Sequence, residues 1–391
     1  MKKEIYFNNA ATSWPKPKNV LIAIEKFFER GRASSGREGF QSSTTVDQPV
    51  ADTRKLLAGL INVKNPNQIV FTLNATEALN LAIKGILNEN DHVIISSMEH
   101  NSVIRPLRNL EQRLKIKISI VKCSRSGELE PKDIEREIRN NTKLIVLLHA
   151  SNVVGTTMPV AEVGEIAKKH RVVYLVDAAQ SAGTIPVDVK AMNIDLLAFS
   201  GHKSLLGPTG TGALYIKEGI NLVPLKEGGT GSKSELEIQP EFLPDRYETG
   251  TLNDVGLVGL EKGIQFIVKT SVKRIREHRE KLTDYFLEGL KKIKNIKVYG
   301  LTNKESLPAG RQGRISVISF NINGMNPAKI GMLLDRRYRI VTRTGLHCSP
   351  LAHRTIGSFP GGTVRVSFGY FNTLEEVNCL ISALREIVKN S

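Results

Sequence analysis

Residues 195–212, DLLAFSGHKSLLGPTGTG, contain the feature on which the fold assignment depends. The apolar run at 196–199 predicts a short buried strand, which ends at Ser200 and is followed by His202, Lys203 and a glycine-rich loop. An amine at the end of a buried strand becomes nucleophilic when burial or a neighbouring cation lowers its pKa, and it can then form a Schiff base with an aldehyde cofactor. The alternative is a solvated lysine in a strand-to-loop turn, because lysines are mostly exposed.

Apolar runs and helix-like stretches alternate through the first part of the chain. Short apolar runs predict strands at 69–73, 93–97, 116–121, 144–149, 172–176, 195–199 and 213–216. Helical spacing of apolar residues predicts helices at 18–30, 46–61, 76–87, 102–114, 131–139 and 159–170. Strand–helix alternation, with strands apolar on both faces, predicts an α/β fold in which helices cover a mostly parallel central sheet.

The character of the sequence changes near residue 253. Two basic helical stretches are predicted within 255–294, followed by apolar runs at 315–322, 340–342 and 363–369 and a final helix at 373–389. We therefore expect a large domain at 16–252 and a smaller α+β domain made of 1–15 and 253–391. The polar segment 303–314 carries no chemistry that the sequence assigns.

The composition narrows the class of protein. The chain has 391 residues, a formal net charge of +16 and three widely spaced cysteines, Cys123, Cys348 and Cys379. Such spacing favours a reducing, cytoplasmic setting over a disulfide framework or a metal site. We see no signal peptide and no apolar run long enough to span a membrane. Basic residues are spread along helical stretches without an aromatic-interleaved motif, so we expect no requirement for nucleic acid.

The first predicted strand of the sheet leads into a helix through Asn74, Ala75, Thr76 and Glu77. Asn74 and Glu77 have the spacing of a capping box, which alone explains their presence. A helix N-terminus after a strand, with exposed N–H groups and the Thr76 hydroxyl, also suits a phosphate group.

Three further strands end in polar side chains. His100 could stack on a planar ring or transfer protons. The alternative is a histidine in a loop that has no functional role. Asn152 could bond a phenolic oxygen or a carboxylate. Asp177, with Gln180 close behind, could pair with a protonated pyridine nitrogen or take part in a structural salt bridge, because a buried carboxylate needs a partner. Together with Lys203, these strand ends suit pyridoxal 5'-phosphate.

A second nucleophile stands in the segment 338–350, YRIVTRTGLHCSP. Cys348 follows Arg343 there, and a cation near a thiol favours the reactive thiolate. The alternative is a small buried filler. Arg365 alternates with apolar Val364 and Val366, so it projects from one face of a strand, and arginine can grip a carboxylate with two parallel bonds.

The motifs occur in an order that resembles the class V aminotransferase-fold family and, within it, the cysteine desulfurases. The pieces that carry the resemblance are NNAATSWPKP, SMEHNSV, HASNVVGT, VDAAQSAG, SGHKSLLGPTGTG, YETGTLN, RTGLHCSP and RVSFGYFNTLEEV. The form RTGLHC is most similar to the branch with a short cysteine loop, which includes selenocysteine-lyase-like enzymes. Leu346 stands where relatives in that branch often carry histidine, and Ala75 replaces a hydroxyl residue.

The resemblance implies roles for the cofactor-site residues. Lys203 would form the Schiff base with pyridoxal 5'-phosphate, and His100 would stack on its ring. The other residues expected to bind the cofactor are Ala75, Thr76, Asn152, Asp177, Gln180, Ser200 and His202. Thr251, in YETGTLN, would reach the phosphate of the neighbouring subunit in a homodimer with a shared active site.

The resemblance also implies the reaction. L-Cysteine would be converted to L-alanine, its sulfur taken up as a persulfide on Cys348 and passed to an acceptor protein. Asn152, Arg343 and Arg365 would bind the substrate. Selenocysteine lysis, or another lyase or aminotransferase reaction of the same fold, is the alternative.

Overall fold

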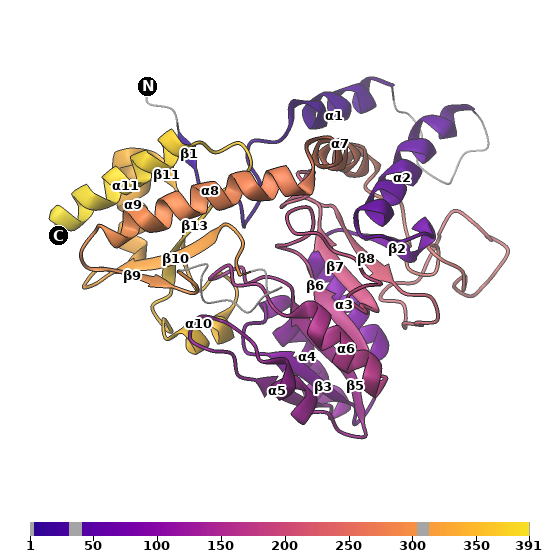
Figure 1. Cartoon of the computed structure of the whole chain (residues 1–391). Coiled ribbons are helices and arrows are strands. Elements are labelled where there is room, and N and C mark those ends of the chain that lie inside the picture. Colours follow the sequence, from indigo (N-terminus) through magenta and orange to yellow (C-terminus); the bar gives the residue numbers. More distant parts are fainter. Residues whose placement is uncertain (1–3, 31–40, 303–312, 391) are drawn as a thin grey trace.

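The larger of the two main sheets forms the centre of the molecule (Figure 1). The computed structural model describes residues 4–30, 41–302 and 313–390. Within these residues the strand order is β2-β8-β7-β6-β5-β3-β4. The strands are β2 (Ile69–Thr72), β3 (His92–Ser96), β4 (Lys117–Val121), β5 (Thr142–Leu148), β6 (Val173–Asp177), β7 (Leu196–Ser200) and β8 (Gly212–Ile216).

This sheet is mostly parallel, which confirms the predicted fold class. Neighbouring strands run parallel from β4 to β7, and β8 runs antiparallel to both β7 and β2. The reversal follows from the connection, because the loop 201–211 is too short for the crossover that parallel neighbours require. The parallel strands therefore end at one edge, where ligands bind in open α/β sheets.

Helices cover both faces of this sheet. They are α2 (Gln41–Leu60), α3 (Ala75–Ile86), α4 (Asn101–Leu114), α5 (Pro131–Arg136), α6 (Val160–His170) and α7 (Asp254–Thr270). Successive strand residues point to opposite faces. On β5, Leu144 and Val146 pack against the core beneath α3 and α4, whereas Ile145 and Leu147 pack against the core beneath α2, α6 and α7. Burial on both faces explains the continuous apolar runs in the sequence.

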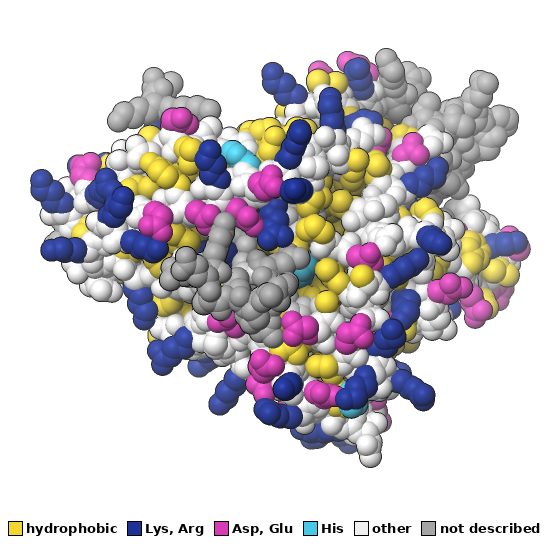
Figure 2. All heavy atoms as spheres, in the orientation of Figure 1, with side chains coloured by type: hydrophobic (Ala, Val, Ile, Leu, Met, Phe, Trp, Pro, Cys, Tyr) yellow, Lys and Arg dark blue, Asp and Glu magenta, His cyan; other side chains and the backbone are white. Residues whose placement is uncertain are grey.

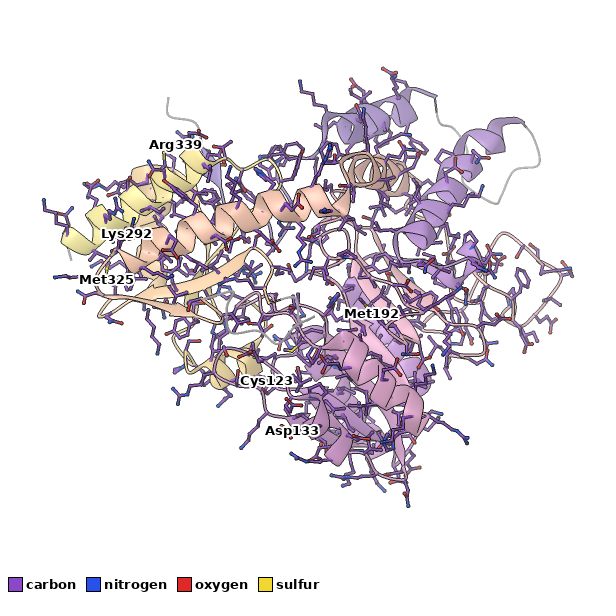
Figure 3. All side chains as sticks on the ribbon, viewed as in Figure 1. Cys123, Asp133, Met192, Lys292, Met325 and Arg339 are labelled. Atoms are coloured by element: carbon purple, nitrogen blue, oxygen red, sulfur yellow. The ribbon has the colours of Figure 1, made fainter. Side chains whose placement is uncertain are left out.

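The smaller body contains an antiparallel sheet with the order β12-β13-β10-β9. Its elements are α8 (Val272–Lys291), β9 (Ile296–Tyr299), β10 (Val317–Ile322), α9 (Pro327–Tyr338), β12 (Arg343–Gly345), α10 (Pro350–Ile356), β13 (Thr363–Ser367) and α11 (Leu374–Lys389). Lys292 and Met325 mark this body in Figure 3, whereas Asp133 and Met192 mark the larger one. The α+β character agrees with the sequence pattern.

The N-terminal segment contributes to the smaller body. Strand β1 (Ile5–Tyr6) pairs in parallel with β11 (Ile340–Val341), and Phe7 packs in the core beneath α8 and α11. Helix α7, in contrast, packs against α1 (Lys18–Arg30) and α2 in the larger body. We therefore propose a domain boundary near Ser271, between α7 and α8, rather than at residue 253.

Some local expectations differ from the structure. Helix α2 begins at Gln41 instead of residue 46, and α5 ends at Arg136 instead of residue 139. The sequence pattern missed β9, β12 and α10, because elements this short leave almost no periodic signal. Most of the segment 303–314 lies outside the described residues. None of the helices in the described part of the chain has the length and apolar character needed to cross a bilayer.

The positive charge is distributed over the surface. Figure 2 shows lysine and arginine side chains across the visible face, interspersed with aspartate and glutamate. Several of the basic side chains form exposed pairs one helical turn apart, such as Arg136 with Asp133 and Lys291 with Glu288. Such exposed pairs contribute little to stability.

Candidate active site

A cavity of about 220 Å³ lies at the carboxyl edge of the larger sheet. It is lined by Asn74, Ala75, Thr76, Leu79, His100, Ser102, Leu148, Ala150, Asn152, Asp177, Ala179, Gln180, Ser200, His202 and Lys203. The structure thus brings together every cofactor residue named from the sequence except Thr251. Thr251 is exposed and lines a separate, shallower hollow with Glu77 and Lys226.

Lys203 stands in the loop where the sheet reverses direction between β7 and β8. Burial lowers the pKa of its amine, and the cations of Arg365 and Arg343 lower it further, while Asp177 opposes them. The structure therefore supplies the environment that turns a lysine into a nucleophile or a base.

Asp177 ends β6 and is buried, with 7% of its surface exposed. Its Oδ1 accepts a hydrogen bond from the Ala179 N–H at 2.8 Å. Burial raises the pKa of the carboxyl, partly offset by that hydrogen bond and by Lys203. A cation placed in the cavity would provide the partner that a buried carboxylate needs.

The N-terminus of α3 faces the cavity. Asn74 caps this helix through a hydrogen bond from the Glu77 N–H to Oδ1 at 3.0 Å, which confirms the cap itself. The reciprocal half of a capping box is replaced, because the Glu77 carboxylate accepts from the Leu73 N–H at 2.6 Å. The Ala75 N–H donates to Ser200 Oγ at 3.0 Å. Among the described residues, no group accepts a hydrogen bond from the Thr76 N–H. This helix end therefore has a free donor, and the helix dipole favours an anion beside it.

Ser102 is a site residue that sequence reasoning missed. Its hydroxyl lies 2.7 Å from Thr76 Oγ1 and 2.9 Å from His100 Nδ1, so it joins α3 to α4 across the cavity. Its position two residues after His100, in EHNSV, was the available signal. Serine is common at helix starts for capping alone, so the pattern carries no chemical specificity.

His100 is held as a neutral ring. It is the N-cap of α4, and its Nδ1 accepts a hydrogen bond from the Ser102 N–H at 3.1 Å, which places the ring proton on Nε2. Burial lowers the pKa of His100 to about 4, with further lowering by Lys203, Arg343 and Arg365. A neutral imidazole at neutral pH can stack on a ring or relay a proton, and it adds no charge.

His202 and Gln180 attach the N-terminal segment to the cavity wall. The main-chain oxygen of His202 accepts hydrogen bonds from the Ser13 N–H at 3.0 Å and from Lys16 Nζ at 2.8 Å. The Gln180 amide donates to Ala10 O at 2.9 Å. Burial lowers the pKa of His202 to about 4, and its Nδ1 is buried without a partner among the described residues. That nitrogen is available to a ligand.

Cys348 and Arg343 lie next to each other. Arg343 Nη2 approaches Cys348 Sγ at 3.2 Å. Arg343 was expected to bind the substrate, and the structure places it on the thiol, where a guanidinium offers a charge-assisted hydrogen bond to a thiolate. We refer to Leu346, His347, Cys348 and Ser349 as the cysteine segment.

The other two cysteines lie away from this site. Cys123, labelled in Figure 3, packs against the main core, and burial raises the pKa of its thiol to about 11. Cys379 is exposed on α11. Neither thiol therefore belongs to the candidate site.

Arg365 is a buried cation without a carboxylate partner in the described part of the chain. Its side chain is among the largest that are fully buried, with 1% exposed. Nη1 donates to Asn152 O at 2.8 Å, Nη2 donates to Asn8 Oδ1 at 3.1 Å, and Nε has no partner. Burial lowers the pKa of Arg365 to about 9, and repulsion from Arg343 adds to this effect. A ligand carboxylate would compensate this charge.

Groups of histidine, cysteine, aspartate and glutamate that could hold a metal ion do not occur among the described residues. The cavity instead offers one amine, one carboxylate, neutral histidines and a helix N-terminus.

Comparisons with known proteins agree with this geometry. The model of the family "Aminotransferase class-V" matches residues 5–380. A "Probable cysteine desulfurase" from Methanothermobacter thermautotrophicus is 35% identical over 99% of this chain and 95% of its own length. A "Cysteine desulfurase" from Escherichia coli is 32% identical over 98% of this chain and 93% of its own length.

Solved structures give the same result. The apo structure of a cysteine desulfurase from Thermococcus onnurineus superposes with a TM-score of 0.91 at 34% identity, over 99% of this chain and 95% of that chain. A cysteine desulfurase from Escherichia coli superposes with a TM-score of 0.87 at 25% identity, over 99% of this chain and 95% of that chain. The extent of these matches confirms the resemblance seen in the sequence motifs: the chain belongs to the class-V aminotransferase family.

Proposed function

We propose that this protein is a pyridoxal-phosphate-dependent cysteine desulfurase that converts L-cysteine to L-alanine and takes up the sulfur on Cys348. One observation carries the proposal: Asn152, which lines the cavity together with Lys203, accepts a hydrogen bond from the buried guanidinium of Arg365 through its main-chain oxygen, and its side chain bonds the residues on both sides of Cys348. A cation for an amino-acid carboxylate and a thiol are thus joined to the wall of the cavity that contains the amine base. The names of the relatives point to the same substrate.

The residues present fit pyridoxal phosphate. Asp177 would pair with the ring nitrogen, and Lys203 would bind the aldehyde carbon. The phosphate would lie at the N-terminus of α3, near Ser200 and the unpartnered Nδ1 of His202. When bound, this cofactor supplies an electron sink that makes the α-proton of an amino acid acidic.

The protein residues then perform three tasks. Arg365 binds the substrate carboxylate and orients the amino acid. The Lys203 amine, with its lowered pKa, removes the α-proton. The Cys348 thiolate attacks the substrate sulfur, so that a sulfur–sulfur bond forms as the carbon–sulfur bond breaks. The electron pair of the broken bond stays on the β-carbon of the substrate, which takes up a proton, and the proton held by Lys203 returns to the α-carbon to give alanine.

The test is to supply the loaded enzyme with L-cysteine and measure alanine by chromatography and sulfur on the protein by mass spectrometry. We expect alanine, and one additional sulfur on the peptide that contains Cys348. Cys348→Ser removes the acceptor thiol and should abolish both, whereas Cys379→Ser is the matched control. Alanine formation that survives in Cys348→Ser would contradict the assignment and favour selenocysteine lysis or another lyase reaction.

Partners and setting complete the proposal. We infer a homodimer in which Thr251 reaches the neighbouring subunit's cofactor phosphate, because Thr251 is exposed and outside its own cavity. Exposed apolar side chains such as Phe28 and Ile238 support an interface between the two subunits.

Cys348 is exposed, as delivery of sulfur to an acceptor protein requires. Three free cysteines suit the cytoplasm. Size-exclusion chromatography with light scattering tests the dimer.

A further inference from the structure

The contacts of the Asn152 side chain point to a role in placing the nucleophile. Asn152 is buried, with 8% of its surface exposed, and lines the cavity. Its Nδ2 donates to His347 O at 2.7 Å, and its Oδ1 accepts a hydrogen bond from Ser349 Oγ at 3.0 Å. Both polar atoms of one side chain therefore hold the two residues that flank Cys348.

The conformation of the cysteine segment shows why it needs to be held. His347 and Cys348 are consecutive non-glycine residues with positive φ angles of 49° and 60°. The left-handed region is unfavourable for such residues and persists only where surrounding contacts impose it. Two further contacts hold these residues: the Asn101 N–H donates to Cys348 O at 2.9 Å, and His347 Nε2 lies 2.9 Å from Thr363 Oγ1.

Ser349 is used in an unusual way. It occupies the N-cap position of α10, yet its side chain makes no capping hydrogen bond. A serine at this position ordinarily caps the helix and stabilises it. Here its hydroxyl donates to Asn152 instead. Helix α10 therefore lacks the capping bond of Ser349, and the cysteine segment gains a contact with a residue of the cavity wall.

The Asn152 amide has one N–H to spare. An amide NH₂ group carries two donors, and among the described residues only His347 O accepts from Nδ2. Because Asn152 lines the cavity, the second donor is available to an acceptor oxygen of a bound molecule. One planar amide can thus contact the ligand and the cysteine segment at the same time.

We propose that Asn152 is a positioning residue that links the molecule in the cavity to the cysteine segment, so that ligand binding fixes Cys348 over the reacting atoms. Ser349 completes the link. The inference rests on the proposed function for the identity of the ligand, an amino acid on the cofactor. Arg365 supports the arrangement, because its Nη1 holds the backbone oxygen of Asn152.

Hydrogen exchange measured by mass spectrometry on the full-length holoenzyme tests the link. The peptide spanning 346–353 reports the Ser349 N–H, bonded to Leu346 O, and the His353 N–H, bonded to Ser349 O. L-Alanine serves as the probe, because it has the carboxylate but no sulfur to transfer. In the wild type we expect L-alanine to slow exchange in this peptide several-fold.

Variants separate the two ends of the link. Asn152→Ala should exchange rapidly in 346–353 with or without L-alanine. Asn152→Asp keeps the acceptor for Ser349 but loses both N–H donors, so it should respond in the same way if the alanine variant folds poorly. Gln180→Ala, which changes a different cavity amide, should keep the wild-type exchange pattern in 346–353 in the absence of L-alanine. Unchanged exchange in both Asn152 variants, or a wild-type response to L-alanine in them, overturns the proposal.

Kinetics provide a readout that a purely structural role would not give. Ser349→Ala removes only the contact on the cysteine side, so kcat should fall about three- to tenfold with KM for L-cysteine unchanged, whereas Asn152→Ala should change both. Equal kcat values for Ser349→Ala and wild type overturn the positioning role. If the wild type makes no alanine from cysteine, the proposed function fails, and the exchange difference between wild type and the Asn152 variants without ligand still decides whether the link exists.

Discussion

Two walls of the cavity are built in different ways. The wall that carries Asp177 and Lys203 consists of the ends of β6 and β7, whose neighbours in the sheet fix their positions through continuous backbone hydrogen bonding. The other wall is the cysteine segment, which meets the cavity at Asn152; its His347 and Cys348 are in left-handed conformation, and it is held by two hydrogen bonds with Asn152 and one each with Asn101 and Thr363.

This difference matches the two kinds of chemistry. Proton removal needs an amine whose position and pKa are constant, and a rigid strand end supplies both. A thiol that receives sulfur in the cavity and then presents it to an acceptor needs a segment whose few contacts can be broken and remade.

The largest expected effect on catalysis comes from Lys203, on the wall formed by the ends of β6 and β7, which we call the rigid wall. Lys203→Ala removes the base and should lower kcat for alanine formation by about 10²–10⁴-fold, the usual contribution of a positioned proton-transfer group. Circular dichroism should show an intact fold, and steady-state kinetics give the ratio. A decrease smaller than tenfold would mean that another group removes the proton.

The second-largest expected effect comes from substitution of Arg365, the buried cation. Arg365→Ala should lower kcat/KM for L-cysteine by about 1.5–3 kcal/mol, the scale of a hydrogen bond to a charged group. The free energy of unfolding should stay constant or rise, because a buried guanidinium without a carboxylate is costly to keep. Urea unfolding and steady-state kinetics on one preparation measure both. A large loss of stability with unchanged kcat/KM would assign Arg365 a purely structural role.

A third prediction concerns the pH dependence of the free energy of unfolding that results from burial of His149. His149 follows β5, is buried with 3% exposed, and has its pKa lowered by burial to about 4. Between this value and the ordinary pKa near 6.5, the unfolded chain binds a proton that the folded chain does not. The free energy of unfolding should therefore rise with pH over that range, by up to about 1.4 kcal/mol per unit for this one group.

Urea unfolding between pH 4.5 and pH 7 measures this slope, and His149→Gln should reduce it. His170, which is exposed on α6, is the matched control, since His170→Gln removes no buried imidazole. An identical slope in His149→Gln and wild type would contradict the buried, neutral state of His149.

The smallest effect lies on the cysteine segment. Arg343→Gln removes the cation beside the Cys348 sulfur and should slow alkylation of Cys348 by iodoacetamide at pH 7 by up to about fivefold, the range of a solvent-exposed charge interaction. Cys379 is exposed on α11 and provides the internal standard in the same mass spectrum. Unchanged alkylation would mean that Arg343 acts on the substrate instead.

The same difference between the walls explains what the sequence could predict. The strand ends follow periodic apolar runs, so the positions of Asp177 and Lys203 could be read from the alternation of strands and helices. Thr76 followed from its place at a helix N-terminus after a strand, whereas Ala75, Ser200 and His202 were expected only from the resemblance to the family.

The cysteine segment could not be predicted in this way. Its contacts join residues from separate bodies, such as Asn152 with His347, and no periodicity encodes them. The sequence put Arg343 near Cys348 and the resemblance gave it the substrate, but the sequence could not decide between these roles, and it gave no reason to single out Ser349 or Ser102. The domain boundary near Ser271 also depends on packing, because α7 and α8 are both amphipathic and only their contacts show which body each joins.

The pairing of β1 with β11 has a consequence for how this chain folds during synthesis. Ile5 pairs with Ile340, so β1 cannot complete its native contacts until synthesis has passed residue 341. The larger sheet, which uses residues 69–216, can form well before that point. Contacts so distant in sequence slow folding. The attachment of Ala10, Ser13 and Lys16 to the cavity residues His202 and Gln180 should therefore be completed last, and a truncated or stalled chain would contain the sheet without a finished active site.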